Sequence, residues 1–351
     1  MLENEPESPL SEREAAVLRA MVKSYVGEAG PIGSTTLANL LPVNLSSASV
    51  RNTLSDLAEK GLVGKAHASS GSIPTERGLR LFVNSLLGPE ELAAYERRSI
   101  SFSVDESAGD AVVSVASQLL SESTRQLGFV VAPRLDRVVL QHVSLVRLST
   151  ESLLVVFVSQ AGTPYRRVID DEWSFDQVEL DHIAAALNER VLGRTLRDVR
   201  SALAREAENA RIRADRLLRR VIELGSRALA ASAEGDEPMD LVIASRLALL
   251  DQPEFQDPRR VRELFAAVEM KERIIEVLDR MLADGGVRVA FGDEVDEPGL
   301  HRCALVATHY GGDEEAPLGV LGVIGPSRMD FARVIALVDF FSQVVTEKLN
   351  A

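Results

Sequence analysis

The fold of the N-terminal part is decided by residues 46–61, which read SSASVRNTLSDLAEKG. Val50, Leu54 and Leu57 recur at i, i+4 and i+7, so they form one apolar stripe along a helix. Ser46 stands before this stripe as a good N-cap, and Gly61 stands after it, where a left-handed residue ends helices. The stretch therefore predicts a helix that buries one face and leaves a polar face open.

Two further helices are predicted before this one. Apolar residues at helical spacing indicate a first helix that Gly27 and Gly30 close. Its apolar positions are Val17, Leu18, Met21, Val22 and Tyr25. Residues 31–33 then form a turn, and Ser34 is suited to cap a second, shorter helix.

A short hairpin is predicted after the third helix. Residues 62–66 and 72–73 can pair as strands around the polar loop 67–71, and Thr75 then opens another helix. Three helices followed by a two-stranded hairpin form the winged version of the helix-turn-helix. The sequence therefore predicts a winged helix-turn-helix DNA-binding domain over residues 10–88.

The third helix would be the recognition helix, and its open face carries side chains that can contact DNA. Arg51 can bond guanine with two donors, Asn52 can bond adenine, and Ala48 can touch a thymine methyl group. The helix start can hold a phosphate, because its free N–H groups and the helix dipole favour anions. The candidate DNA contacts are Ser46, Ser47, Ala48, Arg51, Asn52 and Ser55 in the helix, Lys65, His67, Ser69 and Ser70 in the hairpin, and Arg77 after it.

A protein-docking role is the alternative for this unit. Winged helices also serve as docking modules, serine-rich helix starts are ordinary caps, and most surface arginines are simply solvated. We favour DNA binding because the residue types on the open face suit a major groove.

Charge is distributed unevenly along the chain. The 39 basic and 53 acidic residues give a net charge of −14, whereas nucleic-acid binders are usually basic. Residues 10–87 hold eight basic and six acidic residues, which leaves −16 for the rest of the chain. This asymmetry permits one weakly basic working face, with phosphate contacts expected from Arg51, Lys65, Arg77 and Arg80.

The remaining sequence predicts an interrupted α+β domain. The 351 residues, of which 46% are hydrophobic, suffice for two or three domains with sizeable cores. Residues 1–9 resemble a disordered tail. A helix and an antiparallel meander are predicted over 105–173, a mainly helical block over 174–284, and strands with a terminal helix over 285–351. The helical block is thus expected to be inserted into one domain formed by the two flanking parts.

The composition also bears on the compartment. Cys303 is the single cysteine, so no internal disulfide is possible, and a lone thiol suits a reducing compartment. The acidic N-terminus does not resemble a signal peptide, and the longest apolar runs are too short for a membrane span. We expect a cytoplasmic protein without a cofactor.

The sequence offers little for two other classes of function, a metal-binding protein and an enzyme. His301, Cys303 and His309 would share one face of a strand, but their spacing matches no standard zinc pattern. The sequence shows no phosphate loop or nucleophile elbow, and the glycine-rich run 319–325 reads as a strand, so an enzyme is not expected.

The turn at 325–330 either pairs Arg328 with a nearby acid or couples the C-terminal domain to the DNA-binding unit. Its residue types have a local cause, so we favour the first interpretation.

These residues resemble the family of the heat-inducible transcription repressor HrcA. The resemblance extends from about residue 10 to residue 349. The segments that carry it are 31–37, 45–52, 61–63, 67–71 and 73–80 in the DNA-binding unit, and 251–255, 322–330 and 333–335 in the rest of the chain. Ser72 departs from the family pattern, since it replaces a basic residue of the wing, and Leu79 stands where an aromatic residue is common.

The resemblance implies a winged helix followed by a GAF-like domain with a dimerising insert whose start could precede residue 174. It also implies a homodimeric repressor that binds an inverted-repeat operator, called CIRCE, ahead of chaperone operons. A chaperonin would modulate this activity, and heat would abolish it. The alternative is a regulator that senses a small molecule through its GAF-like domain.

Overall fold

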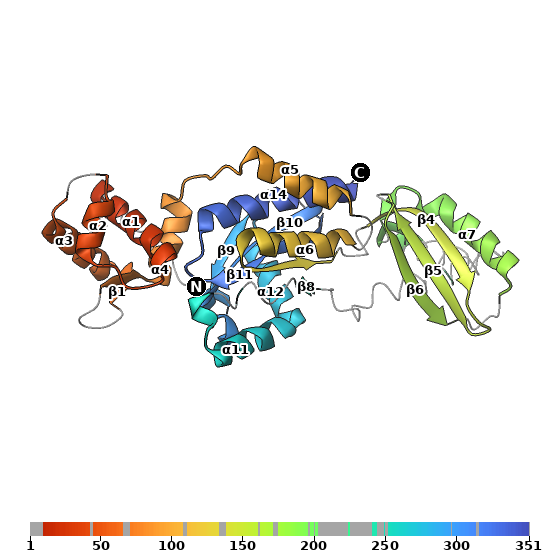
Figure 1. Ribbon diagram of the computed structural model, residues 1–351. Coiled ribbons are helices and arrows are strands. Elements are labelled where there is room, and N and C mark those ends of the chain that lie inside the picture. The colour runs from red at the N-terminus through yellow and green to blue at the C-terminus, as the bar shows by residue number, and fades with distance from the viewer. Residues whose placement is uncertain are drawn as a thin grey trace.

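The computed structural model arranges the chain as three units in a row (Figure 1). A head of helices with a small hairpin lies at one end, a five-stranded sheet lies in the middle, and a second sheet lies at the other end. Among the described residues, no helix has the length and apolarity needed to cross a membrane. The described residues are 10–42, 45–65, 71–107, 111–132, 138–160, 162–170, 175–195, 197–199, 201–202, 224, 241–243, 249, 252–295, 297–313 and 316–350.

The head confirms the helices and the hairpin predicted for it. Its elements are α1 (Glu12–Glu28), α2 (Ser34–Leu40), α3 (Ser47–Glu59), β1 (Val63–Lys65), β2 (Ser72–Pro74), α4 (Glu76–Leu81) and the π-helical turn η1 (Phe82–Leu86). Ser46 caps α3, and Gly61 follows it with φ at 71°. The predicted ends of α1 and α2 were slightly wrong: Ala29 takes the left-handed position after α1, and Gly33 rather than Ser34 is the cap of α2.

The central unit is an antiparallel sheet with helices on both faces. Its strands are β3 (Leu127–Val131), β8 (Leu241–Ile243), β9 (Arg288–Phe291), β10 (Cys303–Asp313) and β11 (Ala316–Pro326), in the order β8-β3-β11-β10-β9. Its helices are α5 (Ala94–Asp105), α6 (Ala111–Thr124), η3 (Pro253–Phe255), α11 (Pro258–Glu269), α12 (Lys271–Met281), α13 (Gly292–Val295), η4 (Pro298–Leu300) and α14 (Phe331–Asn350). Val306 of β10 is buried with α6 and α14, whereas the adjacent Leu305 is buried with α11 and α12. Alternation along the strands therefore divides the core into two layers.

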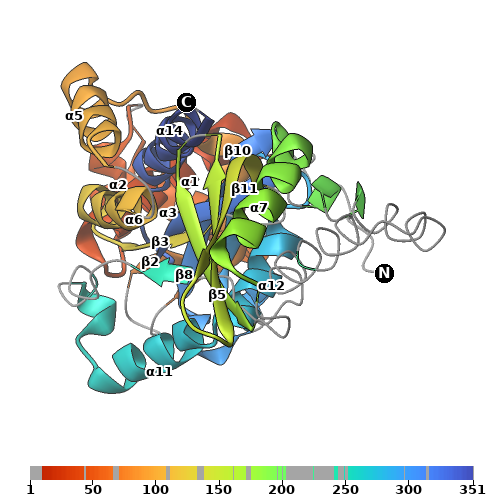
Figure 2. The same ribbon diagram turned by 90° about the vertical axis from the view of Figure 1, so that its right-hand side faces the viewer.

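The outlying unit is a second antiparallel sheet covered by one helix (Figure 2). It consists of β4 (Val139–Arg147), β5 (Ser152–Ser159), β6 (Pro164–Asp170), α7 (Gln177–Val191) and β7 (Arg194–Thr195), in the order β6-β5-β4-β7. Leu153, Val155 and Phe157 of β5 are buried in one cluster with α7. The amide of Asn188 ties α7 to β4, because it bonds both the N–H and the carbonyl of Val143 at 2.7 and 2.8 Å.

This topology corrects the predicted boundary at residue 174. The sequence predicts one meander over 105–173, but β3 pairs with β11 and β8, while β4, β5 and β6 form a sheet of their own. The block 174–284 is also divided, because α7 covers the outlying sheet whereas α11 and α12 pack on the central one. Strand-forming runs are visible in the sequence, but their partners lie far away in it. The tail 1–9 and most of residues 196–233 of the predicted helical block lie outside the described residues.

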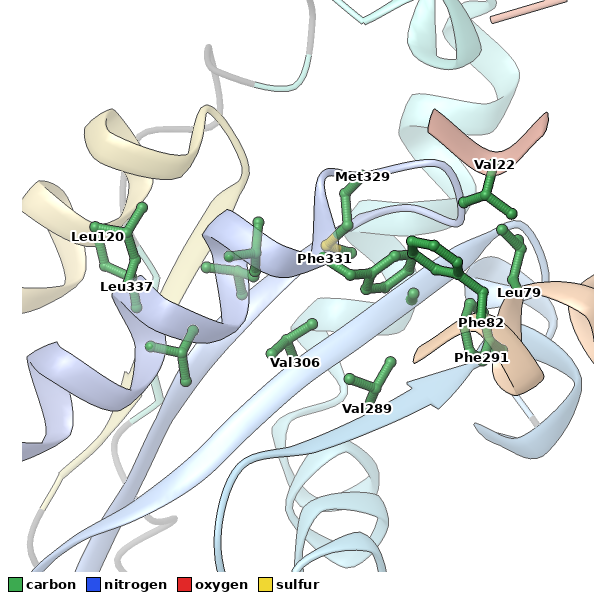
Figure 3. Packing of buried hydrophobic residues seen from close by; sticks show 14 of the residues in the cluster. Val22, Leu79, Phe82, Leu120, Val289, Phe291, Val306, Met329, Phe331 and Leu337 are labelled. Carbon is green, nitrogen blue, oxygen red and sulfur yellow. The ribbon is translucent and has the colours of Figure 1, made fainter. Parts of the chain in front are cut away.

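The head is packed on the central unit through an apolar contact region, which we call the seam (Figure 3). Its members lie in one buried cluster although they come from opposite ends of the chain. They are Val22, Leu79 and Phe82 of the head, with Phe291, Met329 and Phe331 of the central unit. The rings of Phe291 and Phe331 are 5.4 Å apart and tilted by 58°, which is a favourable aromatic geometry.

Arg328 crosses the seam on one side. Its guanidinium pairs with Glu254, bonds the side-chain oxygen of Gln252 at 3.1 Å, and donates to the carbonyl of Val26 at 2.9 Å. Val26 lies in the last turn of α1, where carbonyls have no partner within the helix and cations are favoured. Both interpretations of the turn at 325–330 therefore apply, because Arg328 pairs with an acid and also contacts the head.

Arg80 crosses the seam from the head. It forms a two-bond ion pair with Glu294, donates to the carbonyl of Val289 at 2.6 Å, and lies 4.8 Å from the ring centre of Phe291. The expected phosphate contact from Arg80 is therefore wrong. Each of its three guanidinium nitrogens donates to a partner within the protein.

Candidate nucleic-acid interface

The open face of α3 carries the candidate residues that the sequence assigned to it. Val50, Leu54 and Leu57 are buried in the head, which fixes the rotation of the helix about its axis. The side chains on the other side are exposed, and they are Ser46, Ser47, Ala48, Arg51, Asn52 and Ser55. The structure thus brings six of the proposed contacts together on one polar helical surface.

The start of α3 combines a cap with open N–H groups. The Ser46 hydroxyl accepts from the Ser49 N–H at 3.1 Å, so its role as an ordinary cap is real. The N–H groups of Ser47 and Ala48 have no carbonyl partner within the helix. They lie at the positive end of the helix dipole, so these N–H groups can donate to a phosphate oxygen.

Glu14 of α1 anchors the far end of α3. Its carboxylate lies 2.8 Å from the Lys60 ammonium, directly after α3, and also accepts from the backbone N–H and hydroxyl of Ser11. The hydrogen bond from Lys60, followed by the backbone bond from Ser11, lowers the pKa of Glu14 to about 2. This contact fixes the two helices relative to each other.

Glu14→Gln is therefore expected to lower the free energy of unfolding by about 1–2 kcal/mol at neutral pH. The pKa of Glu14 is lower in the folded chain than in the unfolded one, where the ordinary value is 4.5. The contribution is therefore complete above that pH and is lost as the pH falls toward 2. Urea unfolding between pH 7 and pH 2 measures the difference from wild type, with the exposed Glu12→Gln as control. A difference that stays constant across the range would contradict this assignment.

The hairpin holds Lys65 opposite Ser72, at the end nearest the loop. Lys65 is exposed and Ser72 is half-buried. Ser72 also exchanges two backbone hydrogen bonds of 2.9 Å with Ile32, so the segment predicted as a turn is joined to the hairpin by an isolated antiparallel bridge. A side chain at Gly71 would come within 2.5 Å of the Ile32 backbone, which explains the glycine there.

The other proposed contacts are placed differently. Arg77 is exposed on α4. His67, Ser69 and Ser70 lie outside the described residues. Sequence reasoning missed that two segments of the family resemblance meet in space, since 251–255 supplies Gln252 and Glu254 to Arg328. Both segments belong to the family resemblance, and this shared membership is the signal in the sequence that could have indicated their contact.

The metal alternative gains no support. His301 lies before β10 begins at Cys303, so the three side chains do not share a strand as expected. Cys303 is buried, and burial raises the pKa of its thiol to about 12. No cluster of three His, Cys, Asp or Glu side chains suited to a metal ion is found in the described part of the chain. The glycine-rich run 319–325 lies within β11.

Comparisons with known proteins agree with the family resemblance seen in the sequence. The family described as "HrcA protein C terminal domain" matches residues 110–335. A "Heat-inducible transcription repressor HrcA" of Geobacter sulfurreducens is 34% identical over 343 residues, covering 97% of this chain and 98% of the relative. One of Brucella canis is 36% identical over 349 residues, covering 98% and 97%. A solved structure described as a hypothetical protein has 19% identity and a TM-score of 0.61, covering 97% and 99%, and shares the fold.

Proposed function

The chain belongs to the HrcA family of heat-inducible transcription repressors, and from this premise we propose that its head is a winged helix-turn-helix that reads operator DNA. This is a family of repressors and not a class of enzymes. The observation that carries the proposal is the open face of α3, which combines exposed Arg51 and Asn52 with a free helix start. We propose no catalytic activity and no cofactor.

The operator is proposed to be an inverted repeat of the CIRCE type ahead of chaperone operons, with a chaperonin as modulator. Family membership supports this assignment, as it supports action in the cytoplasm, where the DNA lies. The central unit would be the GAF-like domain, and the segment between β3 and β8 its insert. The direct test is binding of the full chain to an inverted repeat, to a single half-site and to scrambled DNA. Equal binding to all three would refute operator reading.

Few phosphates are available to this head. With Arg80 held in the seam, Arg51, Lys65 and Arg77 can supply about 2–3 contacts per protomer, or about 4–6 for two protomers. The plot of log affinity against log salt should then have a slope of about −4 to −5. Nonspecific binding should be weak, because the rest of the chain carries −16.

Ser72→Arg is expected to steepen that slope by about one for each wing that reaches a phosphate, and to raise affinity for all sequences alike. The backbone of Ser72 is held by Ile32, so the substitution leaves the hairpin in place. Binding to operator and scrambled DNA across a salt series measures both effects. Ser101→Arg, half-buried on α5 of the central unit, is the matched control. If Ser72→Arg changes neither slope nor nonspecific affinity, the wing does not lie against DNA.

We propose that two copies join through the outlying unit. The outer face of its sheet, opposite α7, carries an apolar row in which Val146, Leu154 and Val168 lie side by side in register. Val168 is 59% exposed in the single chain. A second copy would cover this row and supply the second reading head that an inverted repeat needs.

Val168→Lys is expected to weaken the dimer about 100-fold or more, because each copy would place an unpaired ammonium in the apolar contact. Val178→Lys is the matched control, since Val178 is 63% exposed on α7, on the other side of the sheet. Sedimentation of the full-length variants measures the effect. Loss of the dimer with Val178→Lys alone would place the interface on the helix side. No loss with either variant would exclude this unit.

A further inference from the structure

A cavity of about 520 Å³ lies beside the seam, between the head and the central unit. The head contributes α4 and η1 through Arg80, Val83 and Asn84. The central unit contributes α12, β9 and α14, so the walls come from segments that are up to 255 residues apart in the chain. The volume lies within the range of about 300–1,000 Å³ that is usual for small-molecule sites.

The lining combines an apolar wall with a polar rim. Val83, Val277, Met281 and Ile335 are among the apolar side chains that form the wall. The rim carries the guanidinium groups of Arg80, Arg280 and Arg288, together with Asn84 and the carboxylate of Glu294. Binding sites for organic molecules combine apolar surface with placed polar groups. This cavity has both, and its predominantly polar lining suits a charged ligand.

The charges at the rim do not cancel. Among the described residues, Glu294 is the one carboxylate in the lining, and it is occupied by Arg80 and by the N–H of Phe291 at 2.9 Å. Arg288 donates to the carbonyls of Asp284 and Gly285 at 3.2 and 2.8 Å. The carboxylate of Asp284 is 3.7 Å away and its side chain is 87% exposed, so solvent weakens that pair.

Arg280 adds to the excess of positive charge in the cavity lining. It is exposed on α12 and forms no ion pair with another described residue. Within the described part of the chain, Arg280 and Arg288 therefore line the cavity as two cations without a buried counter-charge, in a chain of net charge −14. A local positive potential in an otherwise acidic surface selects for a bound anion.

We propose that this cavity binds a small organic anion, whose phosphate, sulfonate or carboxylate group pairs with Arg280 and Arg288 while its apolar part lies against the wall. The inference goes beyond the proposed function, since it does not depend on DNA binding. The occupant would touch α4 and η1 of the head as well as α12 and β9 of the central unit. Binding would consequently stabilise the docked position of the head.

The test uses 8-anilinonaphthalene-1-sulfonate, a probe with an apolar body and one sulfonate, and follows its fluorescence on titration with the folded full-length chain. We expect one site per chain that Arg280→Glu weakens about tenfold or more, as loss of a charge-assisted pair predicts. Arg262→Glu, an equally exposed arginine on α11 away from the cavity, should leave the affinity unchanged. Equal effects of the two variants, or none, would overturn the proposal.

A second pair of variants tests the position of the site without changing charge. Asn84 lines the cavity, while the neighbouring Ser85 is exposed and does not. Asn84→Trp should place an indole in the cavity and strongly weaken the probe signal, whereas Ser85→Trp should not. Both residues are exposed, so neither variant disturbs the core, and unchanged circular dichroism confirms this. Retention of the signal in Asn84→Trp would overturn the proposal even if Arg280→Glu had weakened binding.

Discussion

Arg328→Ala is expected to lower the free energy of unfolding by about 2–4 kcal/mol, toward the lower part of the cost of breaking a buried ion pair. The Arg328 side chain is 11% exposed, and its loss removes the donors to Glu254, Gln252 and the Val26 carbonyl together. Glu254 keeps 23% exposure, so water can partly replace the lost donor and moderate the cost. Urea unfolding of the full-length chain measures this loss.

Two further variants distinguish the effect of losing the contact across the seam from the general effect of removing a charge. Arg333→Ala removes an arginine paired with Glu96 at 2.6 Å, but that side chain is 39% exposed, so it should cost no more than about 1 kcal/mol. The pair Arg328→Met with Glu254→Leu should recover much of the lost stability, because no unpaired carboxylate is then left. If Arg328→Ala lowers the free energy of unfolding no more than Arg333→Ala does, Arg328 does not hold the head on the central unit.

The head could be predicted from the sequence because its signals are local. The stripe Val50, Leu54 and Leu57, the cap Ser46 and the stop Gly61 all act within one helix and its ends. Burial of the stripe then fixes the open face, so the exposed positions of Arg51 and Asn52 follow without knowledge of the rest of the chain.

The central sheet could be predicted less well because strand pairing is not local. The run 127–131 is recognisable as a strand, but its partners begin at Ala316 and Leu241, while the next strand in sequence joins another sheet. The same limit applies to the arginines. Nothing in the sequence near Arg80 indicates Glu294 as its partner, so the sequence predicts a phosphate contact where the structure has a contact with the central unit.

Replacement of Arg51 or Asn52 by alanine is expected to have the largest effect on operator binding. Each residue should cost about 1–3 kcal/mol per half-site, hence about 2–6 kcal/mol when both protomers carry the substitution. Both side chains are exposed and the helix rests on buried residues, so thermal stability should be unchanged. Titration of operator and scrambled DNA at fixed salt measures the loss, which should be small on the scrambled sequence.

The control for charge is Arg51→Lys, which keeps the cation but loses the two parallel donors that match guanine. If Arg51 reads a base, the lysine variant should lose most of the operator affinity that alanine loses, with nonspecific binding close to wild type. If Arg51 instead touches a phosphate, lysine should restore binding, and alanine should weaken operator and scrambled DNA equally. The second pattern would move base reading away from Arg51 and leave Asn52 to specify the half-site, because a phosphate contact carries no sequence information.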